Sequence, residues 1–78
     1  MIVFPKSPPS GFIPVPDSNQ WHSARVFYAS DAFGSEVRWV ERHRLTIKPG
    51  ETFEVAFKRE FGCRPEPREK AFVPVGLY

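Results

Sequence analysis

Cys63 is the only cysteine of the chain, so no internal disulfide bond can form. A chain of 78 residues forms one domain and buries only about 60% of the surface that its unfolded form exposes. Natural domains of this size often depend on disulfides, a metal or a partner subunit. A four-ligand zinc site would need an unusual ligand set, because the short zinc spacings are absent. Residues 1–78 are therefore expected to form a single domain that is stabilised by aromatic burial or by association with another chain. A homo-oligomer is one form that this association can take.

Aromatic side chains are abundant in this short chain. They make up 15% of it and include eight phenylalanines and two tryptophans. Each large ring can bury roughly 150–250 Å², but a domain this small has difficulty hiding all of them. An exposed aromatic patch is therefore expected, and such a patch favours a binding protein.

Prolines restrict both ends of the chain. Five of them lie in the first 16 residues, namely Pro5, Pro8, Pro9, Pro14 and Pro16. They exclude a helix there and favour extended backbone, so residues 1–10 are expected to form an extended N-terminal arm. The segments GFIPVP (11–16) and AFVPVG (71–76) resemble each other, and proline suits a sheet edge better than a sheet centre. Both segments are predicted to be extended and to lie at sheet edges. They are also candidates for lying next to each other in the fold.

Strand-forming residues occupy the middle of the chain. Residues 23–30, SARVFYAS, favour a strand, and residues 31–35, DAFGS, supply a turn. The segment EVRWVERHRLTI (36–47) predicts a second strand. The KPGE sequence after it places Pro49 and Gly50 at the central positions of a type II turn, which predicts a hairpin.

The segment TFEVAFKREFG (52–62) fits two templates. As a strand it alternates apolar and polar side chains. As a helix it has Thr52 as the N-cap and Gly62 as the residue that ends it. Matching of apolar faces across a hairpin favours the strand. The predicted fold is therefore mainly β, a small single-domain barrel or sandwich of about five short antiparallel strands with proline-rich extended termini, and the alternative is an α+β domain with one short helix at 52–61.

The arginines of the second strand predict a contact surface. In a regular strand Arg38, Arg42 and Arg44 share one face, and neighbours two residues apart are spaced about 6–7 Å, which suits successive phosphates or carboxylates. The formal net charge is +2, and residues 25–48 hold the whole excess. Adding the neighbouring arginine and the aromatic side chains gives the candidate partner-binding residues Arg25, Arg38, Arg42, Arg44, Trp21, Tyr28 and Trp39.

The opposite face of the same strand would bury Glu41 and His43 between Trp39 and Leu45. Burial of a carboxylate is costly unless it is paired or hydrogen-bonded. A β-bulge near Val40 and Glu41 would send the carboxylate outward and let Val40 join the core, and this is the favoured prediction. A buried pair of Glu41 and His43 is the alternative, with an acid–base role as a weaker hypothesis.

No P-loop, dinucleotide-binding glycine pattern, EF-hand or nucleophile elbow is present, so no catalytic residues, metal ligands or cofactors are predicted. The expected function is a small non-enzymatic protein-interaction module, an assembly subunit or an inhibitor or adaptor, that binds a larger protein or protein complex. The alternative is a small nucleic-acid-binding domain with the same arginines on phosphates and the aromatic rings on bases. The apolar run MIVF is far shorter than a signal peptide or a membrane span, so a cytoplasmic protein without membrane contact is expected.

Overall fold

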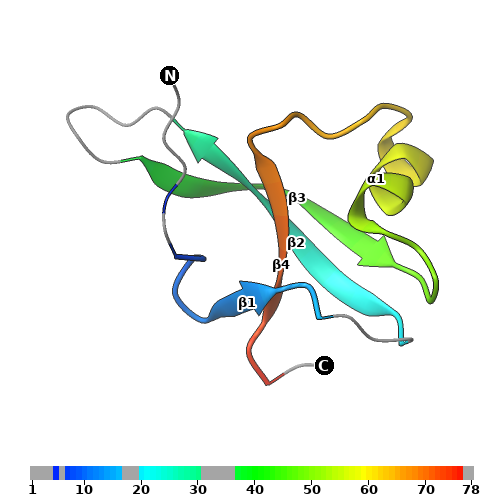
Figure 1. Cartoon of the computed structure of the whole chain (residues 1–78), viewed down its shortest axis with the longest axis horizontal. Coiled ribbons are helices and arrows are strands. Elements are labelled where there is room, and N and C mark those ends of the chain that lie inside the picture. The colour runs from blue at the N-terminus through cyan, green and yellow to red at the C-terminus, as the bar shows by residue number, and fades with distance from the viewer. Residues whose placement is uncertain (1–4, 6, 17–19, 31–36, 77–78) are drawn as a thin grey trace.

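The computed structural model describes residue 5 and the ranges 7–16, 20–30 and 37–76. These ranges contain four strands and one helix (Figure 1). The predicted turn at 31–35 lies outside the described residues. In chain order the elements are β1 (Phe12–Pro14), β2 (His22–Ser30), β3 (Arg38–Ile47), α1 (Phe53–Phe61) and β4 (Glu69–Pro74).

The strands form one antiparallel sheet in the order β1-β4-β2-β3. The prediction of a mainly β, antiparallel fold is therefore confirmed. The sheet is open, so the predicted barrel or sandwich is wrong, and the described residues form four strands instead of five. One strand fewer is present because the segment 52–62, which was expected to form a strand, contains the helix α1. This helix covers part of one sheet face.

Capping at both ends explains why α1 is a helix. The Thr52 side chain accepts a hydrogen bond from the Val55 N–H at 3.3 Å, and Gly62 ends the helix with φ of 74°. The Gly62 N–H donates to the Lys58 carbonyl at 2.8 Å. Both hydrogen bonds satisfy backbone groups that a helix terminus leaves open. Ala56 and Phe57 are the buried residues of the helix. The helical alternative is therefore confirmed, and the favoured strand is wrong.

The KPGE sequence forms the predicted turn but not the predicted hairpin. The Glu51 N–H donates to the Lys48 carbonyl at 3.0 Å, and Gly50 has φ of 81°. A type II turn requires a positive φ at this third position. The turn connects β3 to α1, so the chain leaves the sheet here and does not return as a paired strand.

The two similar proline-containing segments pair with each other. β1 and β4 run antiparallel, with Ile13 opposite Val73. β1 lies at the sheet edge as expected, whereas β4 lies between β1 and β2, so the edge prediction for residues 71–76 is wrong. The interior position tolerates Pro74 because the pairing of β4 with β2 ends at Phe72 opposite Arg25.

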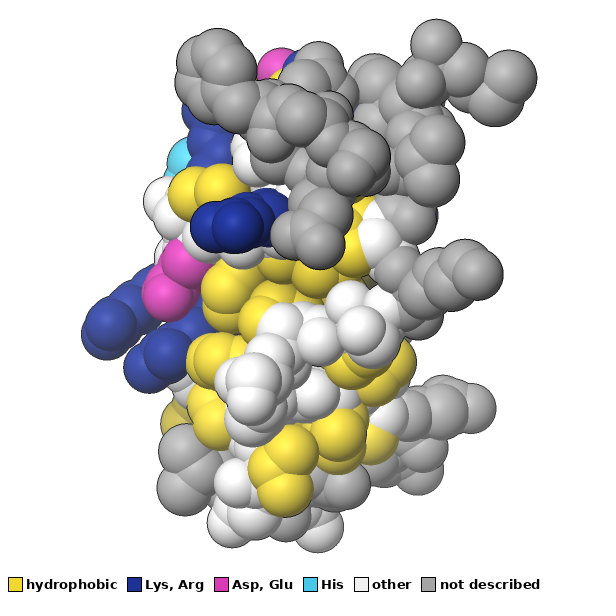
Figure 2. All heavy atoms as spheres, turned by 90° about the vertical axis from the view of Figure 1, so that its left-hand side faces the viewer, with side chains coloured by type: hydrophobic (Ala, Val, Ile, Leu, Met, Phe, Trp, Pro, Cys, Tyr) yellow, Lys and Arg dark blue, Asp and Glu magenta, His cyan; other side chains and the backbone are white. Residues whose placement is uncertain are grey.

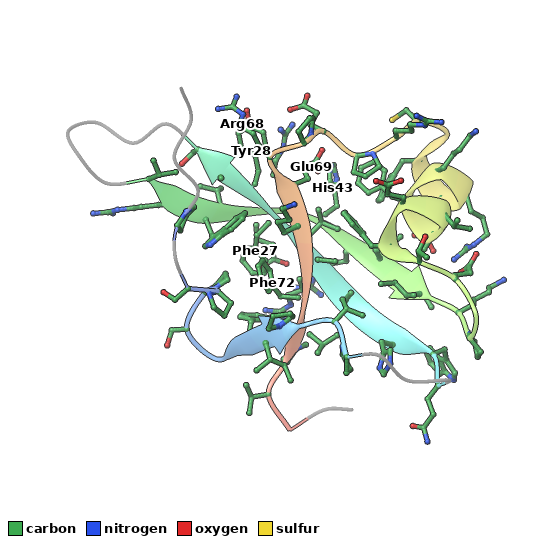
Figure 3. All side chains as sticks on the ribbon, in the orientation of Figure 1. Phe27, Tyr28, His43, Arg68, Glu69 and Phe72 are labelled. Atoms are coloured by element: carbon green, nitrogen blue, oxygen red, sulfur yellow. The ribbon has the colours of Figure 1, made fainter. Side chains whose placement is uncertain are left out.

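The sheet packs apolar side chains on both faces. On the face that carries α1, termed the helix face, the core consists of Ala24, Val26, Leu45, Ile47 and Val73 together with Ala56 and Phe57 of α1. The opposite face, termed the arm face, carries an aromatic cluster in which Phe27 contacts Phe12 at 5.0 Å and Phe72 at 5.8 Å between ring centroids. Figure 3 shows Phe27 and Phe72 side by side.

Candidate functional site

A β-bulge at Arg42 interrupts β3. Val26 pairs with His43 and the next residue of β2, Phe27, pairs with Glu41, so Arg42 has no residue opposite it. The extra residue shifts the alternation of side chains along the strand. The predicted bulge is therefore confirmed, one residue beyond the expected position.

The bulge sends Glu41 outward, as predicted, but it does not bring Val40 into the core. Glu41 is exposed, and Val40 is 47% exposed. Val40 lies opposite Tyr28, and the ribbon of α1 lies over the other end of β3 (Figure 1). The predicted burial of Val40 is wrong for this reason.

The bulge also divides the predicted arginine strip between the two faces. Arg44 lies opposite Arg25, and cross-strand partners share a face, which here is the arm face. The Arg42 guanidinium lies over the Tyr28 ring at 4.9 Å from the centroid, on the helix face. Arg38 lies opposite Ser30 on that same face. A single face for all three β3 arginines is therefore wrong, because the regular alternation ends at the bulge.

Tyr28 contacts two guanidinium groups at the uncovered end of the helix face. Arg42 lies 4.9 Å and Arg68 4.4 Å from its ring centroid. Arg68 comes from the loop before β4, and its carbonyl accepts a hydrogen bond from the Ala29 N–H at 3.1 Å. Figure 3 shows Arg68 beside Tyr28. We call Tyr28, Arg42 and Arg68 the tyrosine–arginine cluster.

Arg68 is not predicted from the sequence, because its segment, CRPEPREK, contains only the signals of an exposed loop. The backbone hydrogen bond to β2 is what places this arginine on the sheet, and it joins residues far apart in the chain. No local periodicity predicts such a contact.

His43 pairs with Glu69 and not with Glu41. Glu69 is 6% exposed, and its Oε2 lies 3.5 Å from His43 Nε2, an ion-pair distance longer than a good hydrogen bond. Its Oε1 accepts a hydrogen bond from the Glu66 N–H at 3.1 Å. Among the described residues, Oε2 accepts no hydrogen bond. The His43 ring packs on Phe61 at 4.8 Å between centroids. Glu69 lies opposite Tyr28 on the neighbouring strand, so the pair lies next to the tyrosine–arginine cluster (Figure 3).

A groove of about 420 Å³ contains three other predicted site residues, Trp21, Arg25 and Arg44. It opens beside His22–Arg25 of β2 and Val73–Pro74 of β4, beyond the last pair of these two strands. The Trp21 side chain is 64% exposed. The groove therefore combines an open aromatic ring with two cations.

Glu41 lies between the two arginines of the groove. Its Oε1 is 3.7 Å from Arg25 Nε and 3.6 Å from Arg44 Nε. Like charges directly opposite each other on neighbouring strands are destabilising, and the carboxylate offsets this repulsion. Two cations share one anion, so the local charge remains positive. Figure 2 shows basic side chains beside an acidic one at the border of an apolar band.

Trp39 belongs to the arm face. It is half-buried, packs on Phe72 at 5.4 Å between ring centroids, and donates from Nε1 to the Ser7 carbonyl at 3.0 Å. The described part of the N-terminal arm therefore contacts this ring. Trp39 is not among the residues that line the groove, and it lies on the sheet face opposite to the tyrosine–arginine cluster.

Within the described ranges, no three His, Cys, Asp or Glu side chains gather as a metal site requires. No helix in the described part of the chain has the length and apolar character needed to cross a membrane. Comparisons with protein families, with curated proteins and with solved structures find no match to this chain.

Proposed function

We propose that the chain is a small non-enzymatic protein-interaction module that binds the surface of a larger protein or complex. The observation that carries the proposal is the contact of Tyr28 with Arg42 and Arg68 on the part of the helix face that α1 leaves open. Tyrosine and arginine are over-represented among the residues that dominate interface energies. A module of this kind serves as an assembly subunit or as an inhibitor or adaptor.

The surroundings of the tyrosine–arginine cluster support this proposal. Val40, 47% exposed, lies opposite Tyr28, and Phe61, 39% exposed, lies beyond His43. Apolar side chains beside arginines match the composition of interface centres. Stacking on the tyrosine ring also orders the guanidinium groups before a partner arrives, which reduces the entropy cost of binding.

Affinity capture with matched variants tests the proposal. The tagged chain is incubated with lysate of its native host, with and without nuclease, and bound proteins are identified by mass spectrometry. The test variant combines Arg42→Ala with Arg68→Ala. The control combines Lys58→Ala with Arg64→Ala, which removes the same charge from exposed residues of α1 and the loop after it. Circular dichroism verifies that both variants fold.

We expect a protein partner that survives nuclease treatment, stays with the control variant and is at least about tenfold depleted with the test variant, a loss of about 1.4 kcal/mol of binding free energy. Equal capture by both variants would remove the tyrosine–arginine cluster from the contact surface. Loss of every bound protein after nuclease treatment would contradict direct protein binding.

Binding of single-stranded nucleic acid is the second candidate function, and the groove beside Trp21 is the observation that favours it. An exposed indole next to Arg25 and Arg44 combines base stacking with phosphate contacts. Fluorescence titration with an oligothymidine at several salt concentrations tests it. Binding that weakens steeply with salt, and that Arg25→Ala with Arg44→Ala removes, supports this function. Absence of binding at low salt contradicts it.

A further inference from the structure

β3 is an edge strand. The sheet order places β2 on one side of it, and no described strand pairs with its other side. An unpaired strand edge presents a row of backbone N–H and C=O groups that can pair with another chain. The direction of these groups along β3 can be derived from the hydrogen bonds of β2.

The Ala29 N–H donates to the carbonyl of Arg68, so the backbone groups of Ala29 face β4. Backbone groups of successive strand residues point to opposite sides, so those of Tyr28 face β3 and its partner Val40. Val40 therefore directs its backbone groups toward β2. Its neighbours in β3 direct theirs outward.

The backbone groups of β3 also alternate in direction on the C-terminal side of the bulge. This alternation identifies the outward-pointing residues of that part of the strand. Val26 faces His43 and Ala24 faces Leu45, so these two β3 residues point inward. The residues whose backbone groups point outward are consequently Trp39, Glu41, Arg44 and Thr46.

The outer edge is closed at its C-terminal end. Arg59 of α1 donates from Nη2 to the outward carbonyl of Thr46 at 2.8 Å. This contact confirms the outward direction of the Thr46 carbonyl. It also blocks a further strand from passing this point. At the other end, Trp39 already contacts the N-terminal arm through its indole, so among the described residues the section open to pairing is 41–44.

Charge determines which chain this section can accept. β3 carries Arg38, Arg42 and Arg44 against a single carboxylate, Glu41. A second copy of the same strand would bring these arginines close to one another, which disfavours self-association. Arg42 lies on the helix face and Arg44 on the arm face. An incoming strand therefore meets an arginine on each of its faces.

We infer that an extended, acidic segment of the partner protein adds to the sheet along residues 41–44 of β3, an inference that rests on the proposed interaction function. The backbone groups of Glu41 and Arg44 hydrogen-bond to the added segment. Arg42 and Arg44 pair with its carboxylates on the two sheet faces. In this mode of recognition backbone hydrogen bonds supply affinity and side chains supply specificity.

Amide hydrogen exchange measured by NMR tests the inference on the full chain. The probe is a capped decaglutamate peptide, which self-repulsion keeps extended at neutral pH, and a decalysine peptide is the control. At a decaglutamate concentration ten times its Kd, exchange of the Glu41 and Arg44 amides is expected to slow about tenfold. The inward amides of Val40 and His43 should change little, and decalysine should have no effect.

Two substitutions separate backbone pairing from charge. Arg44→Pro removes an outward N–H without removing a bond to β2, and proline is tolerated at such edge positions. Arg44→Ala keeps the N–H and loses only the charge. We expect Arg44→Pro to weaken decaglutamate binding about fivefold more than Arg44→Ala, the value of one hydrogen bond. If Arg44→Pro does not fold, the amide exchange pattern of the unmodified chain still shows whether a strand adds along β3.

Two outcomes would overturn the inference, and they differ in their meaning for the proposed function. In the first outcome, decaglutamate shifts the NMR signals of the tyrosine–arginine cluster but the outward amides exchange at unchanged rates. This result would exclude strand addition and leave the proposed interaction surface intact. No response to decaglutamate at low salt would exclude an acidic segment. The capture experiment tests the interaction function independently of both outcomes.

Discussion

Arg59 of α1 donates from Nη2 to the carbonyl oxygen of Thr46 in β3 at 2.8 Å. The same guanidinium binds the Glu51 carboxylate, with 2.9 Å between Nε and Oε2. Glu51 Oε1 in turn accepts the Lys48 N–H at 2.9 Å. One network therefore joins the strand edge, the turn and the helix, and it marks where the open edge of β3 ends.

This network predicts acid sensitivity that Glu51→Gln reduces. The hydrogen bond from Arg59, aided by the Lys48 N–H, holds the pKa of Glu51 below its ordinary value of 4.5. A lowered folded-state pKa contributes stability that is fully present above the ordinary value and is lost as pH falls through the folded-state pKa. Urea unfolding between neutral and acidic pH should show a steeper loss for the unmodified chain than for Glu51→Gln. Glu54→Gln, at an exposed helix position, serves as the control, and parallel curves for the unmodified chain and Glu51→Gln would contradict the prediction.

Thr52→Ala should destabilise the fold by about 1 kcal/mol, because the Val55 N–H loses its N-cap acceptor. Thr52→Ser keeps a hydroxyl at the same place and should retain most of the stability. Urea unfolding midpoints measure both. Equal losses for alanine and serine would show that the hydroxyl does not act as a cap.

Phe57→Ala should destabilise the fold by about 3–5 kcal/mol, because Phe57 is buried in the core that α1 shares with the sheet. That loss is comparable with the total stability of a small domain, so the variant is expected to be largely unfolded at room temperature. Phe61→Ala, at a position 39% exposed, should cost clearly less. Thermal melts followed by circular dichroism compare the two, and a similar melting temperature for both would contradict the packing of α1.

Glu69→Ala should cost about 1–3 kcal/mol, because it leaves the Glu66 N–H without its acceptor in a partly buried place. Glu69→Gln keeps a carbonyl oxygen that can accept this N–H and removes a buried charge. We therefore expect Glu69→Gln to be the more stable variant in urea unfolding. If it is less stable than Glu69→Ala, the hydrogen bond from Glu66 does not stabilise the fold, because both variants lack the carboxylate that faces His43.

Local signals in the sequence predict some elements fully. The KPGE turn is explained by the φ preferences of Pro49 and Gly50, and both ends of α1 are explained by Thr52 and Gly62. The same segment also fits a strand period, and the caps at Thr52 and Gly62 together with the packing of Phe57 against the sheet favour the helix. The hairpin prediction is wrong because a turn signal does not specify whether a strand or a helix comes after the turn.

The candidate site is harder to predict from the sequence than the turn and the helix ends. The unfavourable burial of Glu41 predicts a bulge, but its position at Arg42 depends on how β3 pairs with β2. That one residue decides which arginines share a face. Arg68 reaches Tyr28 only through a long-range backbone contact, which no local pattern encodes.

Hydrogen–deuterium exchange of the chain alone and in complex with its captured partner is the decisive test of β3 and the tyrosine–arginine cluster as the contact surface. We predict that binding protects β3 between residues 38 and 44 and the segment 66–69, which leads into β4, while the exposed outer side of α1 exchanges as before. Protection confined to α1 and the N-terminal arm, with β3 unchanged, would contradict this prediction.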